Sequence, residues 1–357
     1  MGTRSPRRLA LCAAFVLAAA CDNPATPQPP PPPPATLAIT CPPGQTVEGV
    51  TGSGKEVTYP TPPTTGGTFP VAVACAPASG TTFQIGSTTV NCTAADAGTQ
   101  QATCSFNVTL TPRLLQVSKF LAFGDSLTEG ENGIRAVLRR PASIIPGAPY
   151  PAQLAPMLSH EFPTQTFQVV NKGVSGRFAQ DGAKDLPQDL AAERPEALLL
   201  LDGYNNLLRD CPEGGTINSQ CLGAIDLVVA ALALDITNGR SSGAKYVFVS
   251  TLTPPGPVTG PMDRRINGQA IVTMNGRITA MVPGQGAVLV DTYPRFLGHE
   301  AEYVSTDGLH LRPAGYEALA RSFFEVINAT IPSMAAVYSP IALSRPAAHP
   351  RRASGGR

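Results

Sequence analysis

From residue 114 onward, short apolar runs alternate with longer stretches of helical pattern. The apolar runs are Lys119–Phe123, Phe167–Val170, Ala197–Leu201, Lys245–Ser250 and Ala287–Val290. Several are continuously apolar, as in strands buried on both faces of a sheet. The helical patterns lie at 150–161, 180–193, 221–238, 263–281 and 313–330. This alternation predicts an α/β domain with a parallel sheet covered on both sides, whose active residues gather at the carboxyl ends of the strands.

The amino terminus has the pattern of an export signal. Three arginines within the first eight residues precede the apolar run Leu9–Ala20, which is too short to cross a bilayer as a helix. The string Leu17–Cys21 resembles a bacterial lipobox, in which the cysteine is lipidated and becomes the mature N-terminus, although Ala18 is smaller than the usual residue. The alternative is ordinary signal cleavage that leaves Cys21 unmodified. We therefore expect residues 1–20 to be a signal peptide.

This signal sets the expected location of the protein. With Cys21 lipidated, it would be a membrane-anchored lipoprotein of the bacterial cell envelope, periplasmic or at the cell surface. Without lipidation it would be secreted. Residues 21–35 would link the lipidation site to the rest, and the unbroken run Pro29–Pro34 favours an extended polyproline II spacer.

The charge of the chain gives little reason to expect a nucleic acid partner. The full chain carries a formal net charge of +1, and removal of residues 1–20 leaves 23 basic and 25 acidic side chains. A protein that binds nucleic acid usually has a strongly basic surface. The basic residues after 335 stand among Pro, Ala and Gly, and we expect 336–357 to be a disordered tail. We also expect the protein to be a monomer.

The region 36–112 has the pattern of a small all-β domain. Val, Thr and Phe alternate with small or polar residues, and Gly and Pro punctuate the gaps. Its sequence resembles the HYR (hyalin repeat) family of immunoglobulin-like modules. The matching strings are Cys75–Gly80, Phe83–Val90 and Ala94–Asp96. The resemblance implies an immunoglobulin-like β-sandwich that serves spacing or adhesion and performs no chemistry.

Eight cysteines divide into clear groups. Cys12 lies in the signal and Cys21 at its end. The other six are disulfide candidates, because even counts in an exported protein favour disulfides over metal sites. They form one group of four and one pair: Cys41, Cys75, Cys92 and Cys104, then Cys211 and Cys221.

The spacing within the group of four allows three pairings. A turn near Gly98 would set Cys92 opposite Cys104, which favours a bridge between these two and a second bridge from Cys41 to Cys75. The separate pair, Cys211 and Cys221, would close a loop.

Ser126 follows the first strand of the α/β domain, within the string Phe123–Leu127. A serine hydroxyl is a poor nucleophile unless a neighbouring base removes its proton. The strand end and the adjacent glycine allow a sharp turn that would expose this hydroxyl. Alone, the string is more typical of a helix N-cap.

A base is available near the end of the domain. Among four histidines, only His310 has an aspartate three residues earlier, Asp307, just before Pro313 opens the last helix pattern. On one loop, the carboxylate could hold Nδ1–H while Nε2 faces the serine. The alternative for Asp307 is a simple turn residue before Gly308.

Two further strings follow the second and third strands, Asn171–Gly176 and Gly203–Asn206. Gly176 can offer an unobstructed backbone N–H, and Asn205 can offer its amide N–H. Donors of this kind stabilise the negative charge that develops on an ester oxygen during hydrolysis. The alternatives are a loop glycine and a turn asparagine.

These four strings, in this order, resemble the SGNH/GDSL hydrolase family, over about residues 114–332. The resemblance implies a flavodoxin-like three-layer α/β/α sandwich. It implies that Ser126, His310 and Asp307 form a catalytic triad, with an oxyanion hole from Ser126 N–H, Gly176 and Asn205. One departure concerns the third string, where Asn206 replaces an acidic residue that usually helps to fix this loop.

We therefore expect the 113–335 domain to be a GDSL esterase or lipase that hydrolyses carboxylic esters without a metal or other cofactor. Its substrate would be a small-molecule, lipid or glycan ester. One alternative is a polysaccharide O-deacetylase. A second is a surface adhesion or binding protein whose hydrolase domain is inactive.

Overall fold

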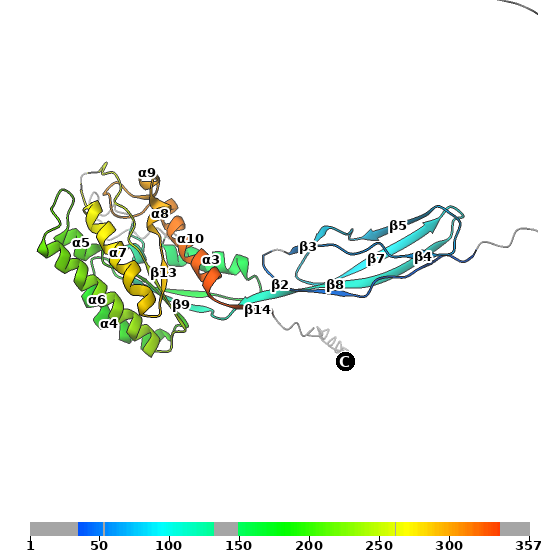
Figure 1. Ribbon diagram of the computed structural model, residues 1–357, viewed down its shortest axis with the longest axis horizontal. Coiled ribbons are helices and arrows are strands. Elements are labelled where there is room, and N and C mark those ends of the chain that lie inside the picture. The colour runs from blue at the N-terminus through cyan, green and yellow to red at the C-terminus, as the bar shows by residue number, and fades with distance from the viewer. Residues whose placement is uncertain (1–34, 53, 132–148, 261, 336–357) are drawn as a thin grey trace, which may run out of the picture.

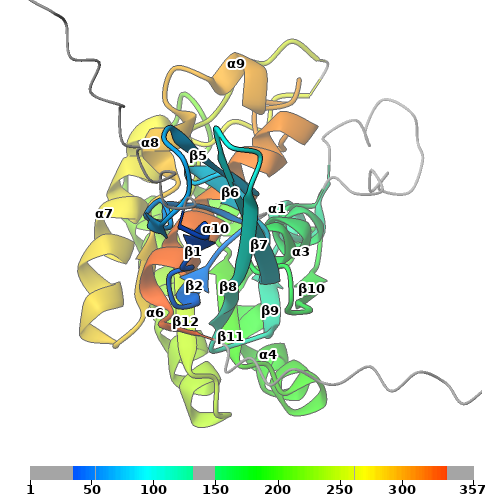
Figure 2. The same cartoon turned by 90° about the vertical axis from the view of Figure 1, so that its right-hand side faces the viewer.

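The computed structural model describes residues 35–52, 54–131, 149–260 and 262–335. The expected signal peptide, Cys12, Cys21, almost all of the proline-rich linker and the basic tail lie outside these residues. The described chain forms an α/β domain and a slender β module that projects from it along the long axis (Figure 1). Figure 2 looks along that axis, with the module in front of the domain.

A five-stranded sheet forms the centre of the α/β domain. All of its strands are parallel, and their order is β10-β9-β11-β12-β13. Their bounds are β9 (Lys119–Gly124), β10 (Gln168–Gly173), β11 (Ala197–Leu201), β12 (Tyr246–Ser250) and β13 (Val288–Val290). The chain runs from β9 to β10 on one side and then crosses back to β11 on the other side of β9. Open α/β sheets bind ligands at such a switch point, beyond the carboxyl ends of the strands.

Helices complete the three-layer α/β/α sandwich. α4, α6 and α7 pack against one another in one layer, and α3 packs against α10 in the other. Short helices α1, α5, α8 and α9 lie in the loops between these elements. The bounds are α1 (Ser126–Glu129), α3 (Tyr150–Glu161), α4 (Ala179–Glu193), α5 (Tyr204–Asp210), α6 (Ser219–Ser241), α7 (Gly268–Gly284), α8 (Tyr293–Phe296), α9 (Glu300–Tyr303) and α10 (Pro313–Thr330).

One of these helices, α6, is rich in apolar residues. By length and composition alone α6 could cross a membrane, but in this fold it packs against α4, α5, α7 and β12.

The expected strands and helices of this domain agree with the structure in type and order. β11 and α10 begin and end at the expected residues. The largest difference is α7, which begins at Gly268 instead of residue 263, because the side chain of Asn267 caps its first turn. This cap accepts hydrogen bonds from the backbone N–H groups of Gln269 and Ala270.

The β module has its own small core. Its main sheet has the order β14-β8-β7-β5, and β2 pairs with β8. Apolar side chains such as Val90, Phe106 and Val108 are buried inside it. The strands are β1 (Ala38–Ile39), β2 (Gln45–Val50), β3 (Lys55–Val57), β4 (Thr64–Thr65), β5 (Val71–Ala76), β6 (Thr81–Phe83), β7 (Gly86–Asp96), β8 (Gln101–Leu115) and β14 (Ser333–Ala335).

β8 connects the two domains without a break. The expected domain boundary lay after residue 112, but β8 continues to Leu115. The reason is a partner from the far end of the α/β domain, since β14 pairs with β8 at Leu114 and Arg113. The guanidinium of Arg113 also donates to the side-chain oxygen of Asn328 in α10.

The expected pairing of the four module cysteines was wrong. The structure joins Cys75 to Cys92 and Cys41 to Cys104. β7 lies between two strands, so Cys92 stands opposite Cys75 in β5 as well as opposite Cys104 in β8. From the sequence, only the hairpin of β7 and β8 was expected to place a cysteine opposite Cys92. The second pair, Cys211 and Cys221, forms a disulfide that closes the loop after α5.

Glu196 holds the amino ends of three strands together. Its carboxylate accepts hydrogen bonds from the backbone N–H groups of Ser118 (2.7 Å) and Lys119 (3.3 Å) before and in β9, and from the ammonium of Lys245 (2.9 Å) before β12. Burial alone would raise the pKa of Glu196, but these donors lower it from 4.5 to about 2. The carboxylate therefore favours the folded state.

We predict that Glu196→Gln lowers the free energy of unfolding at pH 7 by about 1–2 kcal/mol, because the charged carboxylate and its hydrogen bonds are lost. The loss is kept to this size because the group is partly exposed and solvent screens its charge. Since the folded pKa is depressed, the stabilisation is fully present above the ordinary pKa of 4.5 and is lost as pH falls towards 2. Urea unfolding at several pH values measures the difference. Glu193→Gln, which removes partly exposed ion pairs with Lys119 and Lys172, is the control and should change less. An effect of Glu196→Gln that is independent of pH would contradict this account.

Candidate active site

Ser126 begins α1 directly after β9. Asp125 is the N-cap of this helix, and its side chain accepts a hydrogen bond from the backbone N–H of Leu127 at 3.1 Å. The capping role is therefore filled by Asp125, which leaves the Ser126 hydroxyl for other contacts. Ser126 is 3 % exposed.

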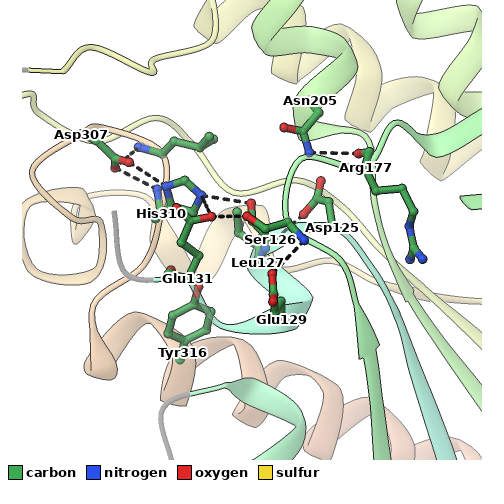
Figure 3. Close-up of polar contacts among 12 residues, drawn as sticks. Asp125, Ser126, Leu127, Glu129, Glu131, Arg177, Asn205, Asp307, His310 and Tyr316 are labelled. Carbon is green, nitrogen blue, oxygen red and sulfur yellow. Dashed lines mark hydrogen bonds and ion pairs between the residues drawn. The ribbon is translucent and has the colours of Figure 1, made fainter. Parts of the chain in front are cut away.

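The structure brings Ser126, His310 and Asp307 together (Figure 3). His310 Nε2 lies 3.0 Å from Ser126 Oγ, and His310 Nδ1 lies 2.6 Å from Asp307 Oδ2. The serine comes from the end of β9, and the other two residues come from the loop before α10, which is 184 residues away in the chain. This arrangement can move a proton from a hydroxyl to a ring whose other nitrogen is held by a carboxylate.

Asp307 is suited to remain charged. Burial alone would raise its pKa, but the hydrogen bond and positive charge of His310, with backbone N–H groups of Leu309 and His310 at 3.1 Å, lower it. An ionised Asp307 can fix the tautomer of His310 with Nδ1 protonated and can stabilise the ring when it becomes cationic.

The two expected oxyanion donors lie in the loops after the strands that flank β9. Gly176 is exposed, with φ +80°, in the loop after β10. Asn205 lies in the first turn of α5, after β11, and its amide Nδ2 donates to the carbonyl oxygen of Arg177 at 2.9 Å. This bond ties the two loops to each other (Figure 3).

Arg177 is buried, and its side chain forms hydrogen bonds with backbone carbonyl oxygens. It is only 9 % exposed, and its guanidinium stacks over the Phe123 ring at 3.9 Å from the centroid. Its Nη2 donates to the carbonyl oxygens of Gly124 and Lys172, at the ends of β9 and β10. The side chain therefore positions the strand ends.

Comparison with known proteins decides the family. The model of the GDSL-like lipase/acylhydrolase family matches residues 122–318, which is more than half of the chain. The chain belongs to this family. The HYR domain model matches residues 32–110. No curated protein matches the chain.

Solved structures resemble the GDSL domain at low identity. An acetylxylan esterase from Geobacillus stearothermophilus is 21% identical over 59% of this chain and 94% of that chain, with a TM-score of 0.45. A lipase/acylhydrolase from Enterococcus faecalis is 20% identical over 61% of this chain and 100% of that chain, with a TM-score of 0.45. Each is covered almost completely, whereas about two fifths of this chain lies outside the match.

Asn206, the departure from the GDSL pattern, is completely buried, and both its side-chain oxygen and its side-chain nitrogen form hydrogen bonds. Its Oδ1 accepts the backbone N–H of Ala179 at 3.0 Å, and its Nδ2 donates to Gln180 Oε1 at 2.8 Å. It therefore binds the start of α5 to the first turn of α4, directly after the loop that contains Gly176. An amide can accept from backbone as an acid does, and it donates a second bond without introducing charge.

Glu131 belongs to the site and was missed by the sequence analysis. Its carboxylate Oε2 lies 3.5 Å from His310 Nε2 and also accepts the hydroxyl of Ser175. Its side chain is 3 % exposed. Figure 3 shows it beside the His310 ring. A signal was available, because Glu129 and Glu131 place two carboxylates within five residues of Ser126.

In the described part of the chain, no group of three or more His, Cys, Asp or Glu side chains is arranged to hold a metal ion. The polar residues that converge on Ser126 are a base, carboxylates and N–H donors, which suit proton transfer and the stabilisation of an anion.

We predict that Asn206→Ala lowers the free energy of unfolding by about 1–3 kcal/mol, because the buried N–H of Ala179 loses its acceptor. Turnover should fall as well, since the change loosens the Gly176 loop. Asn206→Asp keeps the acceptor and should retain more of both. Thermal unfolding and ester hydrolysis of the two variants provide the measurement. Equal loss in both variants would mean that the acceptor is not the important feature.

Proposed function

We propose that this protein is a serine ester hydrolase that works through an acyl-enzyme. The observation that carries the proposal is the chain of contacts from Asp307 through His310 to Ser126, at 2.6 and 3.0 Å. Membership of the GDSL-like lipase/acylhydrolase family supports the same chemistry.

In the first half of the reaction, His310 Nε2 takes the proton of Ser126 as Ser126 Oγ attacks the ester carbonyl carbon. The ring becomes a cation, held by Asp307 at Nδ1. The protonated Nε2 then gives its proton to the departing alcohol oxygen as the carbon–oxygen bond breaks. In the second half, His310 activates a water molecule, which releases the acyl group and restores Ser126.

The negative charge on the carbonyl oxygen needs fixed donors during both halves. We assign this role to the backbone N–H groups of Ser126 and Gly176 and to the amide of Asn205. The Asn205 amide has two N–H bonds, and the bond to Arg177 O uses one of them. That bond also orients the group, so the second N–H is held in a fixed direction.

We predict that Ser126→Ala removes nearly all ester hydrolysis, a loss on the order of 10⁴-fold or more, because no other group can form the acyl-enzyme. The measurement is hydrolysis of p-nitrophenyl esters from acetate to palmitate by the full chain. Ser241→Ala, at the exposed end of α6, is the matched control and should behave as the wild-type protein. Wild-type turnover by Ser126→Ala would overturn the mechanism.

The same series distinguishes the alternatives. Activity on acetate alone, with release of acetate from acetylated glycans, would favour a polysaccharide O-deacetylase. Activity on longer acyl chains favours an esterase or lipase of broad range. A wild-type protein that hydrolyses no ester, and whose Ser126 does not react with a fluorophosphonate, would be an adhesion or binding protein with an inactive hydrolase domain.

We further propose that the protein is exported and held at a membrane by a lipid on Cys21. The support is the sequence alone, an apolar run that ends in Leu17–Cys21. Cys21→Ala should abolish incorporation of labelled palmitate and move the protein from the membrane fraction to the soluble one. Cys12→Ala, within the signal, is the control. Palmitate incorporation by the Cys21→Ala variant would contradict the anchor.

A further inference from the structure

His310 has a second carboxylate beside it, on the nitrogen that faces the nucleophile. Asp307 contacts Nδ1, whereas Glu131 Oε2 lies 3.5 Å from Nε2, the same atom that lies 3.0 Å from Ser126 Oγ. The side chains of His310 and Glu131 are 1 % and 3 % exposed. Charges interact strongly where so little water screens them.

The backbone of Glu131 is fixed on two sides. Its N–H donates to the carbonyl oxygen of Ser126 at 3.0 Å, which ties it to the start of α1. Its carbonyl oxygen accepts the hydroxyl of Tyr316, a buried residue of α10. These bonds connect Glu131 to the nucleophile and to the helix that follows His310, so the carboxylate moves little relative to either.

Ser175 holds the carboxylate from the other side. Its hydroxyl donates to Glu131 Oε2, and its backbone N–H donates to Glu129 Oε2 at 2.7 Å. Ser175 directly precedes Gly176, so the segment that carries a proposed oxyanion donor is attached to the same carboxylate that lies against His310. Figure 3 shows Glu131 beside the ring and the serine.

We propose that Glu131 is a positioning residue of the hydrolase site, whose negative charge stabilises the protonated His310 ring while the ring carries the proton of Ser126. This rests on the proposed function. The Ser126 O–H bond breaks and the His310 Nε2–H bond forms, and the same proton later passes to the leaving alcohol oxygen. Glu131 does not take the proton; it lowers the energy of the cation between these two transfers.

The other acidic groups near the ring make their contacts elsewhere. Asp307 acts on Nδ1. Asp125, the cap of α1, is fully buried, and burial together with the neighbouring Asp202 raises its pKa well above the ordinary value. Its two oxygens accept the N–H groups of Leu127 and Tyr204. Glu129 is turned to Ser175 N–H. Among the residues that the structure describes, Glu131 is therefore the carboxylate placed against Nε2.

The test is the pH profile of kcat/KM for the full chain and for Glu131→Gln on one p-nitrophenyl ester. Glutamine can still accept the Ser175 hydroxyl, so the fold is retained and only the charge is lost. The plateau should fall about tenfold. The acid limb should move to lower pH by about one pH unit, because a ring without the adjacent charge holds its proton less strongly. Glu131→Asp restores the charge and should return the limb towards the wild-type position.

A structural role alone would lower the plateau and leave the acid limb in place, so that result would overturn the proposal, as would an unchanged profile. Glu317→Gln, on the exposed side of α10 next to Tyr316, is the control and should give the wild-type profile. If the wild-type chain hydrolyses no ester, the proposed function fails and this inference fails with it. An active wild-type protein with an unshifted Glu131→Gln profile overturns this inference alone.

Discussion

The site depends on how closely three neighbouring strand ends approach one another. A side chain at Gly124, the last residue of β9, would place its Cβ 1.7 Å from the carbonyl oxygen of Leu201 at the end of β11. A side chain at Gly173, the last residue of β10, would place its Cβ 2.1 Å from the backbone nitrogen of Glu129. No other residue fits at either place. Because the backbone at Gly124 and Gly173 lies this close to its neighbours, the loops after β10 and β11 flank Ser126 directly. The N–H donors of these loops can then lie near the same substrate group that Ser126 attacks.

The β module is built onto this domain as a continuation of the chain's own strand. β8 ends at Leu115 and β9 begins at Lys119, so almost no chain separates the two sheets. β14, which follows the last helix, returns to pair with β8, and the N–H of Gly52 in the module donates to the carbonyl oxygen of Glu161 in α3 at 3.1 Å. The connection is therefore made by several segments. The module projects from the end of the domain where β9 begins, which directs the carboxyl end of β9, with Ser126, away from it (Figure 1).

Features encoded locally could be predicted, and features that need a distant partner could not. β11 consists of five consecutive buried apolar residues, and α10 begins at a proline, so the local sequence indicates where the strand lies and where the helix begins. The continuation of β8 to Leu115, past the expected domain boundary after residue 112, depends on its pairing with β14, more than 200 residues later. The cysteine pairing failed for a related reason, since Cys92 has a cysteine opposite it on both neighbouring strands. Ser126, Asp307 and His310 could be proposed from the sequence because they lie in two short strings, one after the first strand and one before the last helix. The contact between Glu131 and His310 could not be predicted, because it forms only when the distant loop of His310 folds against Glu131.

Arg177 shows how one buried charge can organise the loops of such a site. Its guanidinium donates to the ends of β9 and β10, and its carbonyl oxygen accepts the amide of Asn205 after β11. It thereby contacts all three segments that meet at Ser126. A buried cation is costly unless it is balanced, and Asp202 and Asp235 lie near enough for their pKa values to be lowered by its charge. Burial nevertheless has the larger effect and raises both, that of Asp235 to about 8. With a pKa of about 7 for Asp202 and about 8 for Asp235, both carboxyls are partly protonated near neutral pH and balance the guanidinium only in part. Its hydrogen bonds to the backbone carbonyl oxygens of Gly124 and Lys172 hold the guanidinium at the strand ends, where it positions the loops around Ser126.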